Sequence, residues 1–328
     1  MLPTFATAHI DAFITNMSIA YVQAPSGFVA DRAMPILGVK NRSNKYPIFS
    51  KADFMRDDAK VRAPGTAAAG GGFRMSDDTY SCLEYAYAYE LPDELKANWD
   101  ASLSADRAAV ALLNQKLQIR RERAFSTDFM ATSVWANTDQ TGSATVASAN
   151  GFLQWNDAAS IPIEDIQKQA GVIQLACGFL PNKMVMGWPV FNALRNHPDV
   201  IDRVKHVMKG VITEEILASL LGLEEVLVAK SIYNSAAEAA DATMARIIDK
   251  TALLMFTNPA PAQDQPSAGY TFSWTQFDHI QQLASSGAMG VRTYRVEERG
   301  VDRYEGKSNF DQKAVDTGAA VFFTGAVA

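Results

Sequence analysis

Cysteine is scarce in this chain of 328 residues, with Cys82 and Cys177 as its only two. Two cysteines exclude a disulfide framework and a zinc site built from cysteine. Charge is also scarce, because 20% of the residues are charged against about 25% in a typical globular protein. A soluble protein with so little charge often has much of its surface covered by something else. No apolar run reaches the roughly 18 residues of a membrane-spanning helix, and residues 1–10 lack the pattern of a secretory signal.

The chain has no overall excess of basic residues, since its net charge is −6 and its pI about 5.3. This balance argues against a coat that holds nucleic acid by counterion release. The net charge is −1 over residues 1–39, +4 over residues 40–62 and −9 over residues 63–328. Tyr46, Phe49 and Phe54 interleave with the charges of the middle segment, so we expect part of it to pack. The basic segment could bind nucleic acid, lie on the acidic surface of another copy, or form a solvated loop.

The sequence shows no motif typical of catalysis or metal binding. No H-x-x-x-H or H-E-x-x-H spacing occurs among His9, His197, His206 and His279. The triplet Gly70–Gly72 is not followed by the lysine and helix of a phosphate-binding loop, and no G-x-S-x-G is present. We therefore expect no catalytic residue, no cofactor and no metal site. Cys82 and Cys177 are expected to be buried as small hydrophobic residues.

The first 90 residues predict an arm and a long excursion. Residues 1–40 show no sustained period and are punctuated by proline and glycine, which indicates an extended arm. Residues 45–49 and 79–91 are predicted to form two strands. In the second run, Leu83, Tyr85, Tyr87 and Tyr89 recur at period two. Residues 63–72 would be the flexible tip between the strands.

A long helix is predicted from Asp93 to about Phe125, because this stretch contains neither glycine nor proline. Its apolar residues recur mainly at helical spacing: Leu95, Trp99, Leu103, Val110, Leu113 and Leu117. At 1.5 Å per residue, such a rod is about 45–50 Å long. A helix of this length usually spans a flat or elongated body.

Residues 160–258 predict a layered α/β region. An apolar helical stripe of Ile163, Ile166, Ala170 and Ile173 ends at Gly178, and Thr213 can cap a helix that stops at Gly222. Short apolar runs at 184–186, 226–228 and 251–256 predict buried strands. After a proline-rich linker, further strands are expected at 270–274, 291–298 and 315–323. The finely alternating charges of residues 291–316 suit a strand edge or a contact surface.

Several stretches of the chain have a recognisable sequence. They are Lys45-Tyr46-Pro47-Ile48-Phe49-Ser50-Lys51-Ala52-Asp53-Phe54, Pro181-Asn182-Lys183-Met184-Val185-Met186-Gly187, His197-Pro198-Asp199 and Leu220-Leu221-Gly222-Leu223-Glu224-Glu225-Val226-Leu227-Val228-Ala229. In these stretches, and in the order of the predicted elements over nearly the whole length, the chain resembles major capsid proteins of tailed bacteriophages with the Hong Kong 97-type fold. The shared motifs are packing motifs rather than active-site motifs.

The resemblance implies an α+β fold with five segments. They are an N-terminal arm (1–40), an extended β-hairpin loop or E-loop (41–91), a first part of the peripheral domain with its spine helix (92–159), an axial domain (160–258) and a second part of the peripheral domain (259–328). The loop would reach onto a neighbouring subunit. The residues that we expect at this contact are Lys45, Tyr46, Lys51, Arg56, Lys60 and Arg62.

By the same resemblance, the chain is expected to assemble with itself, as pentamers and hexamers, into an icosahedral or prolate head shell around double-stranded DNA. The shell would form in the host bacterial cytoplasm and end in the virion. The DNA would be enclosed without sequence-specific binding, and no membrane would be involved. Because the chain starts at Met1 without a long helical scaffolding segment, we expect a separate scaffolding protein beside the portal. Whether a decoration protein is added stays open.

The sequence leaves open two alternatives to a phage coat and one covalent modification. An encapsulin-like nanocompartment would keep the fold and enclose an enzyme instead of DNA, and an α/β enzyme with an unrecognised site is more distant. Some capsid proteins of this type join a loop lysine to a neighbour's asparagine through an isopeptide bond. Lys45, Lys51 or Lys60 and an asparagine such as Asn309 could serve in such a bond, but nothing in the sequence singles them out.

Overall fold

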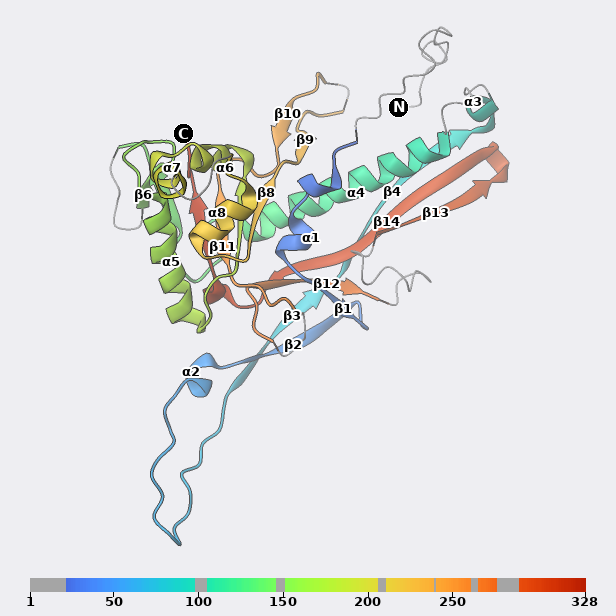
Figure 1. Cartoon of the computed structure of the whole chain (residues 1–328). Coiled ribbons are helices and arrows are strands. Elements are labelled where there is room, and N and C mark those ends of the chain that lie inside the picture. Colours follow the sequence, from blue (N-terminus) through green and yellow to red (C-terminus); the bar gives the residue numbers. More distant parts are fainter. Residues whose placement is uncertain are drawn as a thin grey trace.

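A computed structural model describes residues 22–97, 105–145, 151–205, 211–238, 240–260, 265–275 and 289–328. The chain combines helices and strands in an α+β arrangement with two main sheets and a projecting hairpin (Figure 1). One sheet lies under a long helix, and the other packs against a group of shorter helices. The predicted mixture of helices and strands is therefore confirmed.

The first sheet has five strands and centres on one long strand, β14 (Val301–Ala314). Along one part of its length, β14 pairs antiparallel with both β13 (Met289–Val296) and β4 (Leu83–Pro92), and further on with β12 (Gly269–Trp274). The strand β1 (Ile36–Val39) continues the sheet parallel to β12. The charge alternation of residues 291–316 predicted a strand edge or a contact surface, and β14 is not an edge because it lies between β13 and β4. Its charges are tolerated at the centre because they pair across strands, as Lys307 does with Glu84 at 3.3 Å.

The helix that covers this sheet is α4 (Ala105–Phe129), which follows the short helix α3 (Asp93–Ala97). Residues 98–104, including Trp99 and Leu103 of the predicted stripe, lie outside the described residues. Leu113 and Leu117 are buried, and Gly306 of β14 lies under them. At 1.5 Å per residue, α4 alone is roughly 37 Å long. The helix therefore confirms the second half of the predicted rod and joins the two sheets, since Phe125 and Phe129 at its end lie in the main core.

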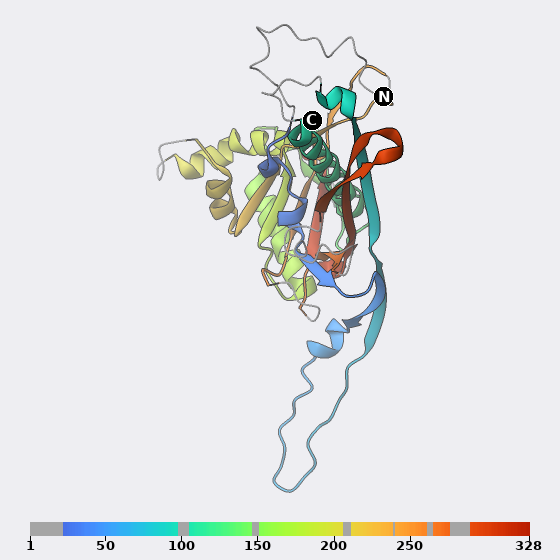
Figure 2. The same ribbon diagram turned by 90° about the vertical axis from the view of Figure 1, so that its right-hand side faces the viewer.

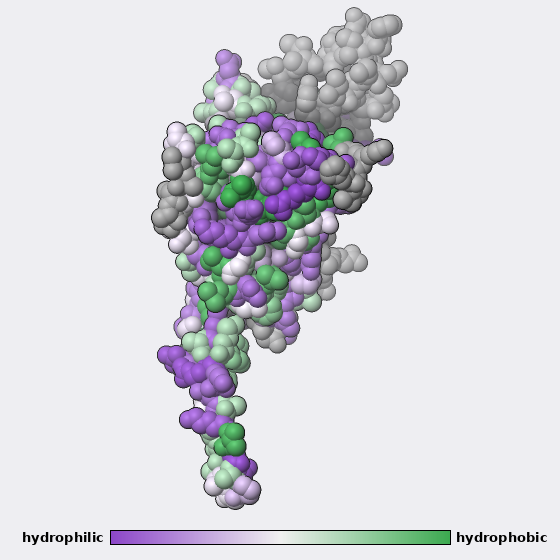
Figure 3. Space-filling view, turned by 60° about the vertical axis from the view of Figure 1, so that its left-hand side comes forward, coloured by the Kyte–Doolittle hydropathy of each residue, from purple (hydrophilic) through white to green (hydrophobic). Residues whose placement is uncertain are grey.

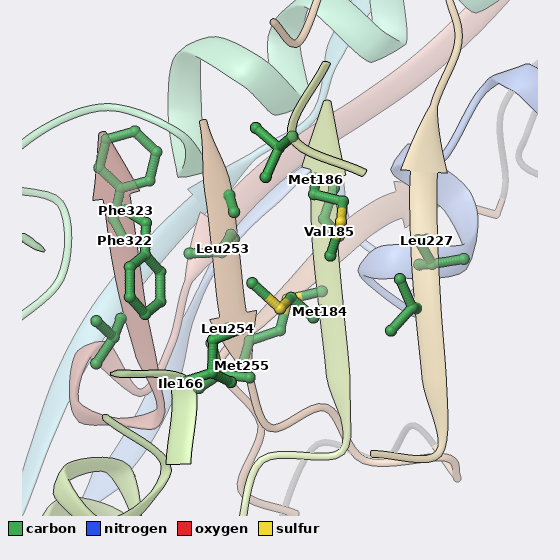
Figure 4. Close-up of a cluster of buried hydrophobic side chains, with 14 of the residues drawn as sticks. Ile166, Met184, Val185, Met186, Leu227, Leu253, Leu254, Met255, Phe322 and Phe323 are labelled. Carbon is green, nitrogen blue, oxygen red and sulfur yellow. The ribbon is translucent and has the colours of Figure 1, made fainter. Parts of the chain in front are cut away.

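The second sheet has six strands in the order β6-β5-β15-β11-β7-β8. Their bounds are β5 (Gln140–Ser143), β6 (Gly151–Leu153), β7 (Lys183–Gly187), β8 (Glu225–Ala229), β11 (Ala252–Met255) and β15 (Ala320–Thr324). The central strands β7, β11 and β15 are almost wholly buried and apolar, and their side chains form the core in Figure 4. Such near-continuous apolar runs are typical of strands with both faces covered.

Four helices pack against this sheet and against one another: α5 (Pro162–Cys177), α6 (Trp188–Arg195), α7 (Pro198–Val204) and α8 (Glu214–Leu221). Their ends follow the predicted signals. The Thr213 hydroxyl accepts a hydrogen bond from the Ile216 amide, and Gly178 and Gly222 end their helices with positive φ angles of 84° and 73°. The layered region that was predicted from residue 160 onward is therefore present.

The hairpin consists of β2 (Ser43–Phe49) and β3 (Met75–Ser81), which pair antiparallel. Between them lies a segment of residues 50–74, called the loop below, which begins with the short helix α2 (Lys51–Phe54). The loop projects far beyond the rest of the molecule in both ribbon views (Figures 1 and 2). An excursion was predicted, but the proposed pairing was wrong for most of the Tyr-rich run. Most of that run forms β4, which pairs with β14. The strand is interrupted at Cys82, and the residues after it join the first sheet.

Three parts of the chain are placed differently from the predicted division. Residues 22–40 were predicted to belong to an extended arm, but they pack on their own subunit, because the helix α1 (Ala30–Ala33) lies on α4 and Met34 is fully buried. Residues 1–21 lie outside the described part. The strand β15 was grouped with the peripheral strands but lies at the centre of the second sheet. Likewise, β5 and β6 join that sheet although residues 92–159 were assigned elsewhere. These two strands are four and three residues long, too short to show a period in the sequence.

A buried carboxylate fastens α1 to α4. Glu122 is 1% exposed, and its oxygens accept hydrogen bonds from the amides of Val29 (3.1 Å) and Ala30 (2.9 Å) and from the Ser231 hydroxyl (3.4 Å). Burial raises the pKa of Glu122 to about 7, and this outweighs the hydrogen bonds, which favour the charged form. The carboxylate of Asp31 on α1 adds to the rise in pKa.

This arrangement predicts a pH dependence of stability. The pKa of Glu122 is raised above its unfolded value of 4.5, so its contribution is complete below about pH 4.5 and is lost as the pH rises through about 7. The loss is on the order of 3 kcal/mol. We expect urea unfolding of the subunit to show lower stability at pH 8 than at pH 5. The variant Glu122→Gln should show a much flatter profile, and an unchanged profile would contradict this role.

Candidate subunit-contact surface

The loop is held in shape at its root by one carboxylate. Asp53 accepts hydrogen bonds from the Arg74 guanidinium at 2.9 and 3.1 Å and from the Arg74 amide at 3.0 Å. Arg56 approaches the same carboxylate at 3.4 Å. The pKa of Asp53 is lowered well below its usual range, chiefly by the hydrogen bonds from Arg74. The two ends of the loop are thus clamped together where they leave the hairpin, and the rest of the loop can project as one piece.

Lys45 and Tyr46, the first two predicted contact residues, lie on β2 and interact within the subunit. The Lys45 ammonium lies 2.5 Å from the carboxylate of Asp77 on β3, and the Tyr46 hydroxyl donates to Asp78 at 3.0 Å. The ring of Tyr46 packs against Phe272 at 5.4 Å between centroids, and burial raises the pKa of Tyr46. Tyr46 therefore anchors the hairpin to the first sheet, while Lys45 stays exposed.

Lys51 also has a partner within its own subunit. Its ammonium forms an ion pair with Asp316, whose carboxylate is largely buried and accepts a hydrogen bond from the Gly318 amide. The same ammonium reaches the carbonyl oxygen of Ala176 at the end of α5 at 3.5 Å. Lys51 therefore holds α2, and with it the root of the loop, against the second sheet and its helix.

The remaining predicted residues, Arg56, Lys60 and Arg62, are exposed along the loop. Arg62 donates from Nε to the Thr66 carbonyl oxygen at 2.5 Å, which shapes the tip, and Arg56 keeps its long contact with Asp53. Lys60 has no ion pair within the part of the chain that the structure describes. These three cations stand away from the acidic body of their own subunit, so their charge is available to a neighbouring molecule.

Sequence reasoning missed an aromatic cluster on the same loop. The rings of Phe49, Phe54 and Phe73 lie 5.2–5.8 Å apart and are all exposed. Such a cluster of exposed aromatic side chains with basic neighbours has the composition of a protein-protein contact rather than of a solvated loop. The sequence signal was the pair Phe49, which ends β2, and Phe54, which ends α2, but Phe73 joins them only through the hairpin pairing.

Other kinds of site find no support in the described residues. None of them form a group of three or more histidine, cysteine or acidic side chains that could hold a metal ion. His197 is buried, where its ring contacts the Ser160 hydroxyl at 3.0 Å and caps α7. Cys82 and Cys177 are buried, as predicted, and burial raises the pKa of both thiols, that of Cys82 to about 12. Among the described residues, no helix is both long and apolar enough to cross a membrane.

The burial of Asn309 contradicts its suggested role in a crosslink. Asn309 lies on β14 and is 2% exposed. Its side chain accepts from the Trp274 amide at 2.7 Å and from the Ser273 hydroxyl at 3.2 Å, and it donates to the Trp274 carbonyl oxygen at 3.3 Å. A lysine of another copy cannot reach it while the sheet is intact.

Comparisons with known proteins agree with this architecture. A family model described as "Phage major capsid protein E" matches residues 143–265. The major capsid protein of Burkholderia phage BcepMu is 24% identical over 229 residues, which cover 68% of this chain and 70% of the relative.

Similar folds also occur among solved structures. A phage-related protein from Bordetella bronchiseptica superposes with a TM-score of 0.67 at 20% identity, over 93% of this chain and 94% of the other. The capsid of cyanophage P-SCSP1u gives 0.62 at 12% identity over 96% and 92%. An encapsulin from Synechococcus elongatus gives 0.58 at 9% identity over 99% and 96%.

The structural matches establish the fold of the chain, which is the Hong Kong 97-type fold. Together with the family model and the BcepMu relative, they confirm the resemblance indicated by the sequence. The family model and the BcepMu relative match the chain to the major capsid proteins of phage shells, which are structural proteins of the virion.

Proposed function

We propose that copies of this chain close into an icosahedral or prolate head shell around double-stranded DNA, with each loop lying on a neighbouring copy. The observation that carries this proposal is the loop itself. It projects from the body (Figure 2), and its aromatic cluster and three of its cations are exposed. While exposed to water, these aromatic side chains do not stabilise the subunit. Burial of one of them against a neighbouring copy would stabilise the contact by about 1.5–3 kcal/mol.

The charge distribution supports a contact between copies. The loop carries five basic and three acidic side chains, a net charge of +2, and residues 75–328 carry −10, so the loop of one copy and the body of another attract each other. Such complementarity mainly speeds encounter and fixes register. The acidic chain leaves no broad basic surface for nucleic acid, in keeping with DNA that is enclosed without sequence-specific binding. No enzymatic activity is part of the proposal.

The proposed domains and partners follow the resemblance to phage coats. The second sheet with α5–α8 would form the axial domain at the centres of pentamers and hexamers, and the first sheet with α4 would form the peripheral domain. Assembly in the host cytoplasm would use a separate scaffolding protein and a portal. Whether a decoration protein is added stays open.

The structural similarity to an encapsulin makes a cargo-filled nanocompartment the second candidate. The shell of a nanocompartment would be built from the same subunit fold. The contents of the particle therefore distinguish the two functions better than its shape does.

The test is negative-stain microscopy of the protein expressed alone and with its neighbouring genes, followed by nuclease digestion and extraction of the contents. The proposal expects closed shells hundreds of ångströms across that protect double-stranded DNA when the packaging genes are present. Shells that contain a single enzyme and no DNA would establish the nanocompartment. A uniform small oligomer in every preparation would overturn both.

A further inference from the structure

A second exposed apolar surface lies outside the loop, at the C-terminal end of α5. The buried stripe of this helix runs through Ile163, Ile166 and Ile173. Leu175 falls outside that stripe and is 90% exposed, and Leu180, just beyond the end of the helix, is 61% exposed. A single exposed leucine is ordinary. Two of them beside a half-exposed phenylalanine, Phe179 at 42%, indicate a surface that is covered in the working molecule.

The root of the loop extends this surface. Phe54 and Met55 are 61% and 59% exposed, and the Met55 methyl lies against Gly178, only 2.9 Å from where a β-carbon would stand. The ion pair of Lys51 with Asp316 holds α2 in this place. In Figure 1, α2 lies just beyond the end of α5, and Figure 3 shows hydrophobic surface on the lower body next to the loop.

Two distant segments therefore place five exposed large apolar side chains near the junction of α2 with the C-terminal end of α5, and this group is called the α5 patch: Phe54, Met55, Leu175, Phe179 and Leu180. With exposures between 42% and 90%, the patch is on the order of several hundred Å², which is the size of the largest patches on monomeric proteins. The ring of Phe179 is fixed by stacking on Phe256 at 4.7 Å, so the patch is preformed.

We propose that a second copy of this chain covers the α5 patch, in a contact additional to the landing site of the loop. The occupant is inferred from charge. The patch continues into the basic segment of the loop, so its partner should present apolar side chains beside acidic ones. The body of another copy, with −9 over residues 63–328, offers that chemistry. The inference rests on the proposed assembly of the chain into shells.

The contact has a consequence for the loop. Because Lys51 and Met55 tie the root of the loop to the end of α5, the copy that covers the patch also fixes the direction in which the loop leaves. Covering the α5 patch and fixing the orientation of the loop would therefore occur in the same binding step. Association is faster and more specific when both elements are preorganised in this way.

The test replaces Leu175 and Leu180 by glutamate in the full chain. Both side chains are exposed, so the subunit should keep its circular dichroism spectrum and melting temperature. We expect the yield of shells to fall at least tenfold. The matched control is Ile161→Glu, an exposed apolar residue at the opposite end of the same helix, and it should assemble normally.

Hydroxyl-radical footprinting of the unmodified protein gives a second readout. Leu175 and Met55 should be oxidised at least fivefold more slowly in shells than in free subunits. Failure of the unmodified chain to form shells would refute the proposed function itself. Normal shells from the double variant, or equal oxidation of Leu175 in shells and subunits, would refute the α5 patch contact alone.

Discussion

Reversing the charge of Arg56, Lys60 and Arg62 to glutamate abolishes shell formation and leaves the subunit folded. This is the largest effect that we expect on assembly. All three side chains lie on the exposed loop, so the body loses no packing. Arg56 gives up its exposed 3.4 Å contact with Asp53, but Arg74 still holds that carboxylate. Like charges brought together across a contact cost several kcal/mol. Even about 2 kcal/mol per contact lowers pairwise association roughly 30-fold, and a closed shell repeats every contact many times.

The measurement is particle yield by sedimentation, with circular dichroism to monitor the fold. A suitable control reverses Lys116, Lys168 and Lys250, which are exposed elsewhere and change the net charge equally. Lys51 is left out of the test set, although it was among the predicted contact residues. A glutamate there would face the buried carboxylate of Asp316 and disturb the fold itself. Full particle yield from the loop variant would refute the docking role of these cations.

Replacing Gly187 by alanine should cause the largest loss of stability. Gly187 ends β7, and a β-carbon there would stand 1.8 Å from the carbonyl oxygen of Asp249. The backbone of Ile248 and Asp249 lies on one side of Gly187, and the paired strand β8 lies on the other. The chain at Gly187 therefore cannot shift to make room for a methyl group. Overpacking of this kind costs about 3 kcal/mol or more, which should lower the melting temperature of the subunit by roughly 6–12 °C.

Gly171→Ala serves as the matched control, because Gly171 lies inside α5 with no atom within 4 Å of the new methyl group. Alanine in a helix is favoured over glycine by roughly 0.5–1 kcal/mol, so this variant should melt slightly higher than the original chain. Thermal unfolding followed by circular dichroism compares the two. Equal melting temperatures for both variants would show that the close approach at Gly187 is not limiting.

Local signals predicted the helices of the second layer because each carries its own information. The stripe of α5, the cap Thr213 and the stop Gly222 all act within a few residues, and the structure has these ends where the sequence indicated them. The strands β7, β8 and β11 were found for the same reason, since a short apolar run between turn signals is enough to predict a buried strand.

Pairing between distant strands could not be predicted in the same way. The run from Thr79 to Leu91 was predicted as a single strand, but its residues belong to two sheets. Those before Cys82 pair with β2, and those after it pair with β14. The strand β14 looks exposed in sequence because it carries many charges. Some of these charges pair with residues more than 200 positions away, as Arg303 does with Glu90. Strand order is decided by tertiary packing, which no single period encodes.

The candidate contact surface was predicted in part. Charge counting located the loop, and Arg56, Lys60 and Arg62 are exposed on it. Tyr46 and Lys51 have partners within the subunit that lie far away in sequence, Phe272 and Asp316. Residue type alone cannot separate a cation that binds its own fold from one that binds a neighbour. The contact itself stays a prediction for all six residues.

The most direct test of the account is a cryo-electron microscopy map of the assembled particle. The account predicts a closed shell in which residues 50–74 of each copy lie on an adjacent copy, with Phe54 and Phe73 buried at that contact. A closed shell in which the loop folds back on its own subunit, or stays in solvent, would contradict the proposed contact. Particles that never close would contradict the shell itself.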